Sequence, residues 1–255
     1  MNKLLQGKNA LITGAGKNIG KSIAIEMAKQ GANVFFSDID RDRCAQLKQE
    51  LNRYPVVSKG FISDVSRSED VDSLCNSLLQ DRIKIDILVN NVGIHFGGRT
   101  IKDLDLKEWK RVFDTNVLGP MYLTKRISKT MIDNHVSGSI IFITSIHQWT
   151  IRRFPSYSSS KAALGMIVKE LALELAPYSI RVNGIAPGYV EEDKNGNTIA
   201  HKYTPLYKSS INPCYIGRAA VYLSSDFFSR FTTGTVLKID AGLSLYNHLV
   251  DQVPL

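Results

Sequence analysis

A doubly wound α/β fold, in which helices cover both faces of a seven-stranded parallel sheet, is the architecture that the sequence predicts. Short apolar runs alternate with amphipathic segments of helix length along the 255-residue chain. The apolar runs are typical of strands that are buried on both faces, as in a parallel sheet. Neither a repeat period nor a low-complexity linker divides the chain, so residues 1–255 are expected to form one domain.

The first four strands are predicted from apolar runs that end in small or polar residues. They are expected at residues 9–14, 33–38, 56–64 and 85–91. The helices between them are expected at residues 19–30, 41–53 and 69–80. Gly31 follows the first of these helices and Pro55 the second, and both residue types commonly end a helix.

The second half of the chain continues the alternation after two helical stretches, expected at 106–114 and 117–134. Strands are expected at 138–145, 180–188 and 234–240, and helices at 155–176 and 211–224. Ligands of such sheets bind at the carboxyl ends of the strands. The first six strands lead into "TG", "SD", "SD", "NNVG", "TS" and "APG", so we expect these turns to share one site.

The composition indicates a globular protein of a reducing compartment. Hydrophobic residues make up 44% of the sequence and charged residues 22%, and no apolar run approaches the length of a membrane span. The first residues are not expected to form a signal peptide. The cysteines Cys44, Cys75 and Cys214 are far apart and form no metal-ligand pattern with histidine or carboxylates. We therefore expect a cytoplasmic protein with no bound metal.

The net charge of +8 makes nucleic-acid binding a hypothesis to weigh. However, the basic residues are scattered, with nothing longer than doublets such as Lys110-Arg111, and no aromatic residues alternate with them in a stripe. We therefore expect a small-molecule substrate, and neither a nucleic-acid nor a membrane partner.

Seven segments carry a resemblance to a known family: "TGAGKNIG", "DILVNNVGI", "DTNVLG", "GSIIFITS", "YSSSK", "IRVNGIAPGYV" and "VLKIDAG". In order and approximate spacing, from about Lys8 to Gly242, they resemble the short-chain dehydrogenase/reductase (SDR) family of the roughly 250-residue type, with its TGxxxGxG, NNAG and YxxxK motifs. The resemblance implies a Rossmann-type NAD(P)-binding domain. It also implies an oxidoreductase that interconverts an alcohol and a ketone or aldehyde with NAD(P)(H).

The segment "YSSSK" has a chemistry that can be argued from the residues alone. Tyr157 and Lys161 lie four apart on a predicted helix, so their side chains share a face. A free tyrosine has a pKa of about 10, and a neighbouring ammonium favours the phenolate and lowers it. Tyr157 is then able to take the proton of an alcohol or return it to a carbonyl oxygen. The alternative is a surface tyrosine beside a solvated lysine.

Two further catalytic roles follow only from the resemblance. It implies that Ser145 hydrogen-bonds the substrate oxygen. Ser145 precedes Tyr157 by 12 residues, whereas the family usually shows 13, the separation of Thr144; we expect Ser145 and a loop shortened by one. Asn116 matches a helix-breaking asparagine that supports a water chain from the lysine. Its alternative is an ordinary helix cap.

The loop "TGAGKNIG" departs from the family pattern at its middle glycine. Gly14 and Gly20 match, and Asn18 stands where the remaining glycine belongs. Asparagine tolerates left-handed backbone better than other non-glycine residues, and it can cap the helix expected to begin at Ile19. The loop therefore still predicts a dinucleotide site, with the pyrophosphate at the helix N-terminus. A structural turn without a ligand is the alternative.

The remaining cofactor contacts are implied by the resemblance. Asp64 and Val65 are expected at the adenine, Gly93 at the adenosine ribose, and Pro187-Gly188 beside the nicotinamide. The "YVEED" that follows replaces a threonine that relatives often carry there. The full expected cofactor set is Gly14, Lys17, Asn18, Ile19, Gly20, Asp38, Ile39, Asp64, Val65, Asn91, Val92, Gly93, Tyr157, Lys161, Pro187, Gly188 and Val190.

The choice of cofactor depends on opposing charges. Asp38 ends the second strand, where a carboxylate can accept the ribose hydroxyl hydrogens and repel a 2′-phosphate. Lys17 stands where relatives that use NADP often carry a basic residue, and Arg41 and Arg43 follow Asp38 closely; a salt bridge from them to Asp38 would soften the repulsion. We expect NAD as the preferred cofactor, with NADP use still allowed.

The substrate is predicted only by class. The expected substrate contacts are His95, Ser145, His147, Trp149 and Tyr189, with a substrate loop at about 189–210. This polar set favours a hydroxylated small molecule such as a sugar or polyol. Alternatives are a 3-oxoacyl-(acyl-carrier-protein) reductase, an epimerase or dehydratase of the same fold, and a non-catalytic nucleotide-binding regulator. The resemblance also implies a homotetramer paired through the helices that carry "YSSSK" and "DTNVLG".

Overall fold

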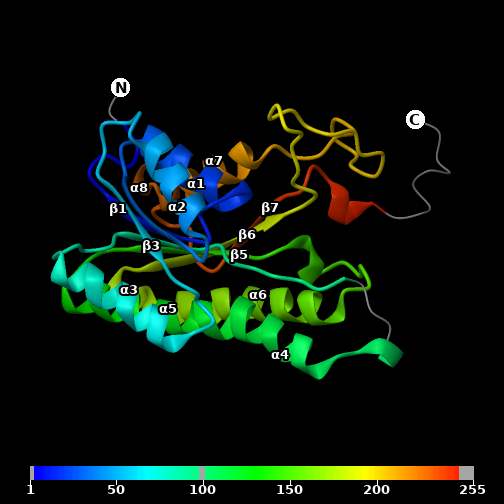
Figure 1. Ribbon diagram of the computed structural model, residues 1–255, viewed down its shortest axis with the longest axis horizontal. Coiled ribbons are helices and arrows are strands. Elements are labelled where there is room, and N and C mark those ends of the chain that lie inside the picture. The colour runs from blue at the N-terminus through cyan, green and yellow to red at the C-terminus, as the bar shows by residue number, and fades with distance from the viewer. Residues whose placement is uncertain (1–2, 98–100, 247–255) are drawn as a thin grey trace.

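The computed structural model describes residues 3–97 and 101–246, which form a three-layer α/β fold (Figure 1). The central sheet has seven parallel strands in the order β3-β2-β1-β4-β5-β6-β7. The predicted fold class is therefore confirmed. The strands are β1 (Asn9–Thr13), β2 (Asn33–Asp38), β3 (Ser58–Ile62), β4 (Ile87–Asn90), β5 (Ser139–Ile143), β6 (Arg181–Pro187) and β7 (Val236–Ile239).

Two layers of helices cover the sheet. One layer holds α1 (Asn18–Lys29), α2 (Arg41–Leu51), α7 (Pro213–Ser224) and the short α8 (Asp226–Ser229); the other holds α3 (Ser68–Gln80), α4 (Leu106–Phe113), α5 (Gly119–Asp133) and α6 (Pro155–Leu175) (Figure 1). The chain runs outward from β1 through β2 to β3 and then returns to place β4 on the other side of β1. This reversal opens a crevice at the carboxyl ends of β1 and β4, where ligands of such sheets bind.

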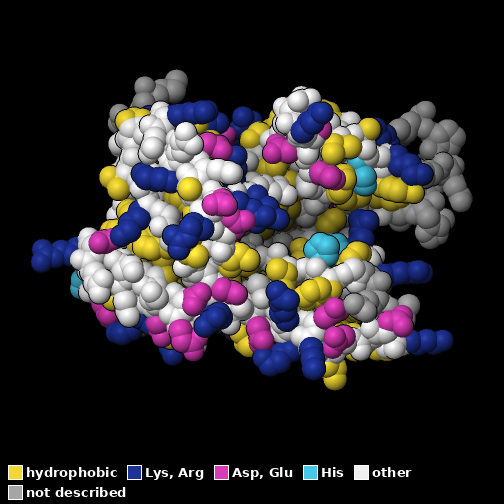
Figure 2. Space-filling view, in the orientation of Figure 1, with side chains coloured by type: hydrophobic (Ala, Val, Ile, Leu, Met, Phe, Trp, Pro, Cys, Tyr) yellow, Lys and Arg dark blue, Asp and Glu magenta, His cyan; other side chains and the backbone are white. Residues whose placement is uncertain are grey.

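The visible face of the molecule carries charges of both signs. Lysine and arginine side chains are interspersed with aspartate and glutamate, and the surface is hollowed near its centre (Figure 2). None of the helices in residues 3–97 and 101–246 is both long and apolar enough to cross a bilayer.

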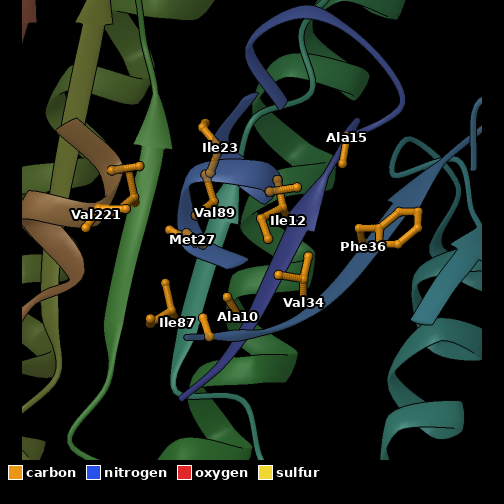
Figure 3. Close-up of a cluster of buried hydrophobic side chains, with 14 of the residues drawn as sticks. Ala10, Ile12, Ala15, Ile23, Met27, Val34, Phe36, Ile87, Val89 and Val221 are labelled. Carbon is orange, nitrogen blue, oxygen red and sulfur yellow. The ribbon is translucent and has the colours of Figure 1, made fainter. Parts of the chain in front are cut away.

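Each strand of the sheet centre contributes to two cores, one on each face. On β1, Ala10 and Ile12 belong to the core under α1 and α7, whereas Leu11 belongs to the core under α3, α5 and α6. Figure 3 shows the first of these cores, with Ile23 and Met27 of α1 packed over the strands. Because alternate residues of a strand face opposite sides, only strands that are apolar throughout can fill both cores.

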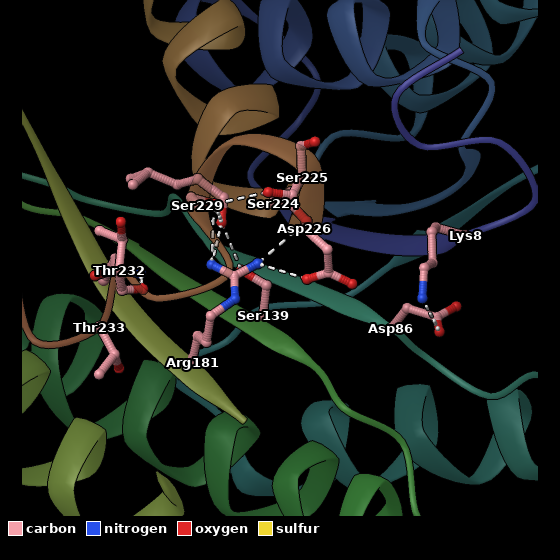
Figure 4. A network of polar contacts seen from close by, with 12 residues as sticks. Lys8, Asp86, Ser139, Arg181, Ser224, Ser225, Asp226, Ser229, Thr232 and Thr233 are labelled. Atoms are coloured by element: carbon pink, nitrogen blue, oxygen red, sulfur yellow. Dashed lines mark hydrogen bonds and ion pairs between the residues drawn. The ribbon is translucent and has the colours of Figure 1, made fainter. Parts of the chain in front are cut away.

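Arg181 joins the amino end of β6 to the end of α7 (Figure 4). Its guanidinium is nearly buried and donates to Leu223 O at 2.6 Å and to Ser229 Oγ at 3.2 Å, with Asp226 Oδ1 3.3 Å away. A buried arginine is tolerated when its donors find partners. This network lies at the opposite end of β6 from the crevice, so its role is to hold the fold together.

The predicted and observed elements differ mainly at their ends. Strand β3 spans Ser58–Ile62 rather than 56–64, because it is an edge strand that pairs only with β2. The two helices expected at 106–114 and 117–134 are joined by a π-helical turn, Asp114–Leu118, which is centred on Asn116. The sequence did not predict α8 or the short 3₁₀ turns, which are too brief to show a periodic pattern.

Candidate active site

A cavity of about 720 Å³ lies along the carboxyl ends of the strands. Every residue expected to contact the cofactor lines it, from the Gly14 loop at one end to Val190 at the other. Of the expected catalytic and substrate residues, Ser145, Tyr157, Lys161, His95, His147 and Tyr189 also line it. Asn116 and Trp149 are the two expected residues that are absent from its wall.

The YxxxK pair lies at the start of α6 with both side chains on one face of the helix. Lys161 is buried, and its Nζ lies 5.5 Å from the centroid of the Tyr157 ring. The ammonium donates a hydrogen bond to Ile143 O, 2.8 Å away at the end of β5. This bond anchors Lys161 to the sheet and leaves its positive charge beside Tyr157.

The pKa of Tyr157 differs from the sequence-based expectation. Burial raises it, and a hydrogen bond with the Ser145 hydroxyl only partly opposes that increase. The same burial lowers the pKa of Lys161 to about 8. In the chain alone the Tyr157 pKa is therefore raised and not lowered as expected, because burial disfavours the charged phenolate.

Ser145 and Thr144 direct their hydroxyl groups differently. The Ser145 hydroxyl contacts Tyr157 and accepts a hydrogen bond from His147 N at 3.2 Å. The Thr144 hydroxyl donates to Ile185 O at 3.1 Å, on the neighbouring strand β6. Ser145 is thus the hydroxyl beside Tyr157. The loop after it begins with a 3₁₀ turn, Ile146–Gln148, which Ser145 caps.

Asn116 is fully buried behind the wall of the cavity. Its side-chain oxygen accepts from Ile94 N at 2.8 Å, and its nitrogen donates to Ile94 O at 2.9 Å and to Ser160 Oγ at 3.0 Å. The residue lies within a π-helical turn, a rare feature that is frequent at functional sites. Asn116 therefore connects the segment after β4 to α6, and it does not cap a helix.

The glycine-rich loop has the backbone that its sequence predicts. Asn18 has a φ of 47°, in the left-handed region. A Cβ atom on Gly20 would lie 2.3 Å from Gly14 O, so this close turn requires glycine. Helix α1 begins at Asn18, with the extended Lys17 at the N-cap position and no side-chain cap. The expectation that Asn18 caps a helix beginning at Ile19 is therefore wrong.

The first turn of α1 suits a phosphate group. It contains no acidic side chain, and its backbone N–H groups point out of the helix end toward the cavity that Asn18 and Ile19 line. The amide of Asn91 donates to Thr13 O and to Gly14 O, both at 3.0 Å, and so braces the loop against the segment after β4. The loop is thus preorganised beside a cavity open to a dinucleotide.

Asp38 lies at the same end of the cavity and is held by backbone donors. Its Oδ2 accepts from Gly16 N at 2.8 Å, and its Oδ1 accepts from Asp40 N at 3.1 Å. Arg43 pairs with Asp40, with Nε 3.3 Å from Oδ2, and not with Asp38. The carboxylate of Asp38 therefore lies at the cavity wall without an ion pair to Arg43.

The expected adenine end contains one polar atom without a partner. Asp64 fixes the turn after β3 by accepting from Ser66 N at 2.9 Å. The neighbouring Ser63 Oγ is buried, lines the cavity and has no hydrogen-bond partner among residues 3–97 and 101–246. A buried hydroxyl without a partner is costly, so a polar ligand group at this end is favoured. Together with the phosphate loop and Asp38, it fits an adenosine dinucleotide.

Comparison with known families identifies the class of protein. Residues 8–202 match the family model described as short chain dehydrogenase. The chain belongs to the short-chain dehydrogenase family. It is accordingly an oxidoreductase that interconverts an alcohol and a carbonyl compound with NAD(H) or NADP(H).

Several relatives of this short-chain dehydrogenase are known. It is 32% identical over 255 residues to glucose 1-dehydrogenase 2 of Bacillus subtilis, covering 96% of this chain and 98% of that protein. It is 32% identical to a 7α-hydroxysteroid dehydrogenase solved with NADH and 7-oxo glycochenodeoxycholic acid, with a TM-score of 0.85 and coverage of 94% and 96%. A 3-oxoacyl-[acyl-carrier protein] reductase of Brucella melitensis with bound NAD is 28% identical, with a TM-score of 0.85 and coverage of 96% and 94%.

In this short-chain dehydrogenase, aromatic rings surround Tyr157 at the substrate end of the cavity. The ring centroids of His147 and His95 lie 5.1 Å and 5.7 Å from that of Tyr157. Phe154 lies 5.8 Å from each histidine. Burial lowers the pKa of His147 to about 4, so its ring is neutral at pH 7. The substrate-facing wall is therefore aromatic, with rings packed edge to face, and two of these rings are imidazoles that carry nitrogen atoms.

Trp149 does not line the cavity. Its side chain is half exposed, and Lys238 of β7 lies over its ring, 4.5 Å from the centroid. The 3₁₀ turn after Ser145 directs His147 inward and leaves Trp149 on the outer side. The expectation of a Trp149–substrate contact therefore finds no support in the geometry.

The expected substrate loop contributes Tyr189 and His201, whose rings stack at 4.4 Å. Other wall residues were not predicted as ligands from the sequence, among them Arg43, Ser63, Ser66, Ile94, Arg111, Thr115, Ile143, Thr144, Ile146, Phe154 and Leu243. Phe154 could have been suspected from its place three residues before Tyr157. Leu243 could not, because only the folded chain brings the segment after β7 to this cavity.

Proposed function

We propose that this short-chain dehydrogenase is an NAD(H)-preferring enzyme whose substrate is a hydroxylated small molecule of the sugar or polyol class. The observation that carries the proposal is the contact of Tyr157 with Ser145 and Lys161 inside a cavity with a polar, aromatic wall. A long apolar substrate would offer no hydrogen-bond partner to polar side chains of this wall such as His95, whereas His147 Nδ1 already bonds to Ser158 Oγ at 3.1 Å. The relatives of known activity include a glucose dehydrogenase, which agrees with this class.

Each catalytic residue has a proposed role at a stated atom. When bound, the nicotinamide supplies the hydride acceptor for alcohol oxidation or the hydride donor for carbonyl reduction. Tyr157 takes the hydroxyl proton at its phenolate oxygen or returns it as a phenol. Ser145 Oγ donates a hydrogen bond to the substrate oxygen as that oxygen gains negative charge.

Lys161 and Asn116 act on Tyr157 and its surroundings. The ammonium of Lys161 stabilises the phenolate, and its bond to Ile143 O holds it in place. A Cβ on Gly93 would lie 3.1 Å from Lys161 Nζ, so the backbone passes close to this charge. Asn116 positions that backbone through both polar groups of Ile94. We propose that Asn116 is a positioning residue for the end of the cavity that binds the nicotinamide.

The preference for NAD(H) is proposed from the charges at the adenosine end. The Asp38 carboxylate lies there, held by backbone N–H groups, and the Arg43 guanidinium pairs with Asp40 instead. A carboxylate accepts hydrogen bonds from two ribose hydroxyls and repels a 2′-phosphate. Lys17 lines the same end of the cavity and would favour NADP(H). We therefore expect the enzyme to prefer NAD(H) and still to use NADP(H) at a lower kcat/KM.

The function is tested by a screen of sugars, polyols, steroids, ketones and 3-oxoacyl thioesters, read at the absorbance of the reduced nicotinamide and by chromatography of the products. Tyr157→Phe is expected to lower kcat by about a hundredfold or more, because a positioned general acid or base contributes at least that much. NADH binding, measured by its fluorescence, is expected to stay within about twofold. A Tyr157→Phe variant that keeps more than about a tenth of the rate contradicts the acid–base role.

The alternatives are separated by the same screen. An acyl-carrier-protein reductase would reduce a 3-oxoacyl thioester in preference to every polyol or sugar. A non-catalytic regulator would bind NADH and turn over nothing. An epimerase or dehydratase would convert its substrate with no net change in the nicotinamide.

We also propose that the chain forms a homotetramer. Apolar side chains are exposed on α6, where Met166 and Leu173 are 55% and 79% accessible, and at the end of the π-helical turn before α5, where Leu118 is 60% accessible. Burying such side chains between subunits is favourable. The mass in solution, measured by light scattering after size exclusion, tests the assignment, and a monomer at micromolar concentration contradicts it.

A further inference from the structure

We propose that Arg152 determines the substrate class of this enzyme by pairing with a carboxylate, so that the substrate is a small hydroxy acid or the corresponding oxo acid. This inference rests on the proposed function, because it assumes that the reacting carbon faces Tyr157. It goes further by assigning a charged group to the substrate and a partner to Arg152.

Arg152 belongs to the segment that forms the substrate end of the cavity. This segment connects β5 to α6, and it also supplies Ser145, His147 and Phe154 before it reaches Tyr157. Arg152 is partly buried and lines the cavity. Its neighbour Arg153 is exposed and does not line it, so the two arginines differ in what they face.

The guanidinium of Arg152 has little to bind within the protein. Its one hydrogen bond among the described residues is a long one, from Nε to Thr150 Oγ1 at 3.5 Å. No aspartate or glutamate in residues 3–97 and 101–246 forms an ion pair with it. A partly desolvated guanidinium with free donors gains most from a bidentate anion, and a carboxylate matches its planar geometry.

Charge is distributed unequally along the cavity. The carboxylates that line it, Asp38 and Asp64, lie at the adenosine end, whereas no aspartate or glutamate is among the lining residues around Tyr157. Glu191 lies nearby and is engaged by the Tyr189 hydroxyl. The substrate end therefore has no described carboxylate in its wall that would repel an anionic substrate.

The other basic groups around Tyr157 are poor partners for an anion. Lys161 is buried and bonded to Ile143 O. His147 is neutral at pH 7, because burial and the nearby charge of Arg152 lower its pKa to about 4. Arg111 also lines the cavity, but its guanidinium lies over the Phe96 ring, 5.7 Å from the centroid. Arg152 is thus the permanent cation next to His147, whose pKa its charge helps to lower. Since the His147 ring lies 5.1 Å from that of Tyr157, the carboxylate is expected within a few atoms of the reacting carbon.

The test compares acids with neutral molecules of the same carbon chain. The pairs are D-gluconate with sorbitol, and 3-hydroxybutyrate with 1,3-butanediol. Initial rates with NAD⁺ give kcat/KM for the wild type, for Arg152→Ala, for Arg152→Lys and for the matched control Arg153→Ala. Calorimetric titration of D-gluconate and sorbitol into the NAD⁺-loaded protein gives a readout that does not depend on turnover.

The wild type is expected to prefer the acid in at least one pair. Arg152→Ala is expected to lower kcat/KM for that acid, and the affinity for it, by about tenfold or more, because a charged hydrogen-bond partner is lost. The neutral partner is expected to change by less than about twofold. Arg152→Lys is expected to recover part of the loss, since it restores the charge without the planar fork, and Arg153→Ala is expected to behave as the wild type.

Two results would overturn the inference and leave the proposed function intact. One is a wild type that uses the neutral member at least as well as the acid in every pair. The other is an acid whose kcat/KM responds equally to Arg152→Ala and Arg153→Ala. If no compound of these pairs or of the wider screen is turned over, the proposed function fails instead. The inference is then tested by the calorimetric titration alone. It is overturned if the NAD⁺-loaded protein does not bind gluconate, or if Arg152→Ala leaves its affinity for gluconate unchanged.

Discussion

Replacing Asp38 with serine is expected to narrow or invert the preference of the enzyme for NAD(H) over NADP(H). In the structure Asp38 is only 7% exposed, and both oxygen atoms of its carboxylate accept hydrogen bonds from backbone N–H groups. These bonds hold the charge at the cavity wall, where the adenosine ribose is proposed to bind. Serine removes the charge and keeps one hydroxyl that can still bond a ribose oxygen.

The size of the effect follows from the charges. Two unit charges about 4 Å apart interact by roughly 4 kcal/mol at an effective dielectric constant near 20. Side-chain adjustment and solvent reduce this value, yet a third of it, about 1.4 kcal/mol, already corresponds to about a tenfold preference. Arg43 does not cancel the charge of Asp38, because its guanidinium pairs with Asp40 at 3.3 Å.

The assay measures kcat/KM for NADH and for NADPH with one carbonyl substrate, together with the dissociation constant of each reduced cofactor. The wild type is expected to favour NADH by about tenfold, and Asp38→Ser to reduce that ratio by about the same factor. Asp42→Ser is the matched control. It removes the same charge from the exposed first turn of α2, outside the cavity lining, and is expected to leave the ratio unchanged.

Two outcomes would refute this reasoning. If the wild type has a higher kcat/KM with NADPH than with NADH, Lys17 and Arg43 outweigh Asp38. If Asp38→Ser and Asp42→Ser change the ratio equally, the preference comes from the overall charge of the protein and not from the site.

Three further outcomes are expected. Ser145→Ala is expected to lower kcat by about a hundredfold or more and Thr144→Ala by much less, because only the Ser145 hydroxyl lies beside Tyr157. Steady-state measurement of kcat for both variants tests this, and a larger loss in Thr144→Ala contradicts the assignment. Asn18→Gly is expected to keep cofactor affinity and Asn18→Val to weaken it, because a β-branched residue resists a φ of 47°; NADH titration checks this, and equal affinities contradict it. Burial raises the pKa of Tyr157, so the rate of alcohol oxidation, which needs the phenolate, is expected to rise with pH across the neutral range. The rate of carbonyl reduction, which needs the phenol, is expected to fall at alkaline pH. Profiles of kcat/KM against pH in both directions test this, and an oxidation rate independent of pH contradicts it.

The order of the strands and long helices, and the edge of the sheet at which the cavity lies, could be predicted from the sequence alone. Continuous apolar runs predict strands that are buried on both faces, and β1 supplies both cores as expected, with Ile12 on one side and Leu11 on the other. Short motifs at the ends of these runs predict one site, because the carboxyl ends of parallel strands lie at one edge of the sheet. The left-handed backbone of Asn18 was likewise predictable, since few other residue types tolerate it.

Other features were decided only by tertiary structure. The partner of Arg43 is Asp40 rather than Asp38, although both carboxylates lie within a few residues of it. Trp149 lies outside the cavity and Arg152 inside it, although three residues separate them in the same loop. Asn116 bonds to Ile94 and Ser160, and the helix accommodates it with a π-helical turn.

These features share a physical cause. Helix and strand patterns arise from local periodicity, which can be read along the chain. Side-chain partners and burial depend on which distant segments meet, and a pKa depends on both. The pKa of Tyr157 shows the difference: the spacing of "YSSSK" places a cation four residues away and predicts a lowered value, but folding removes the phenol from water and raises it.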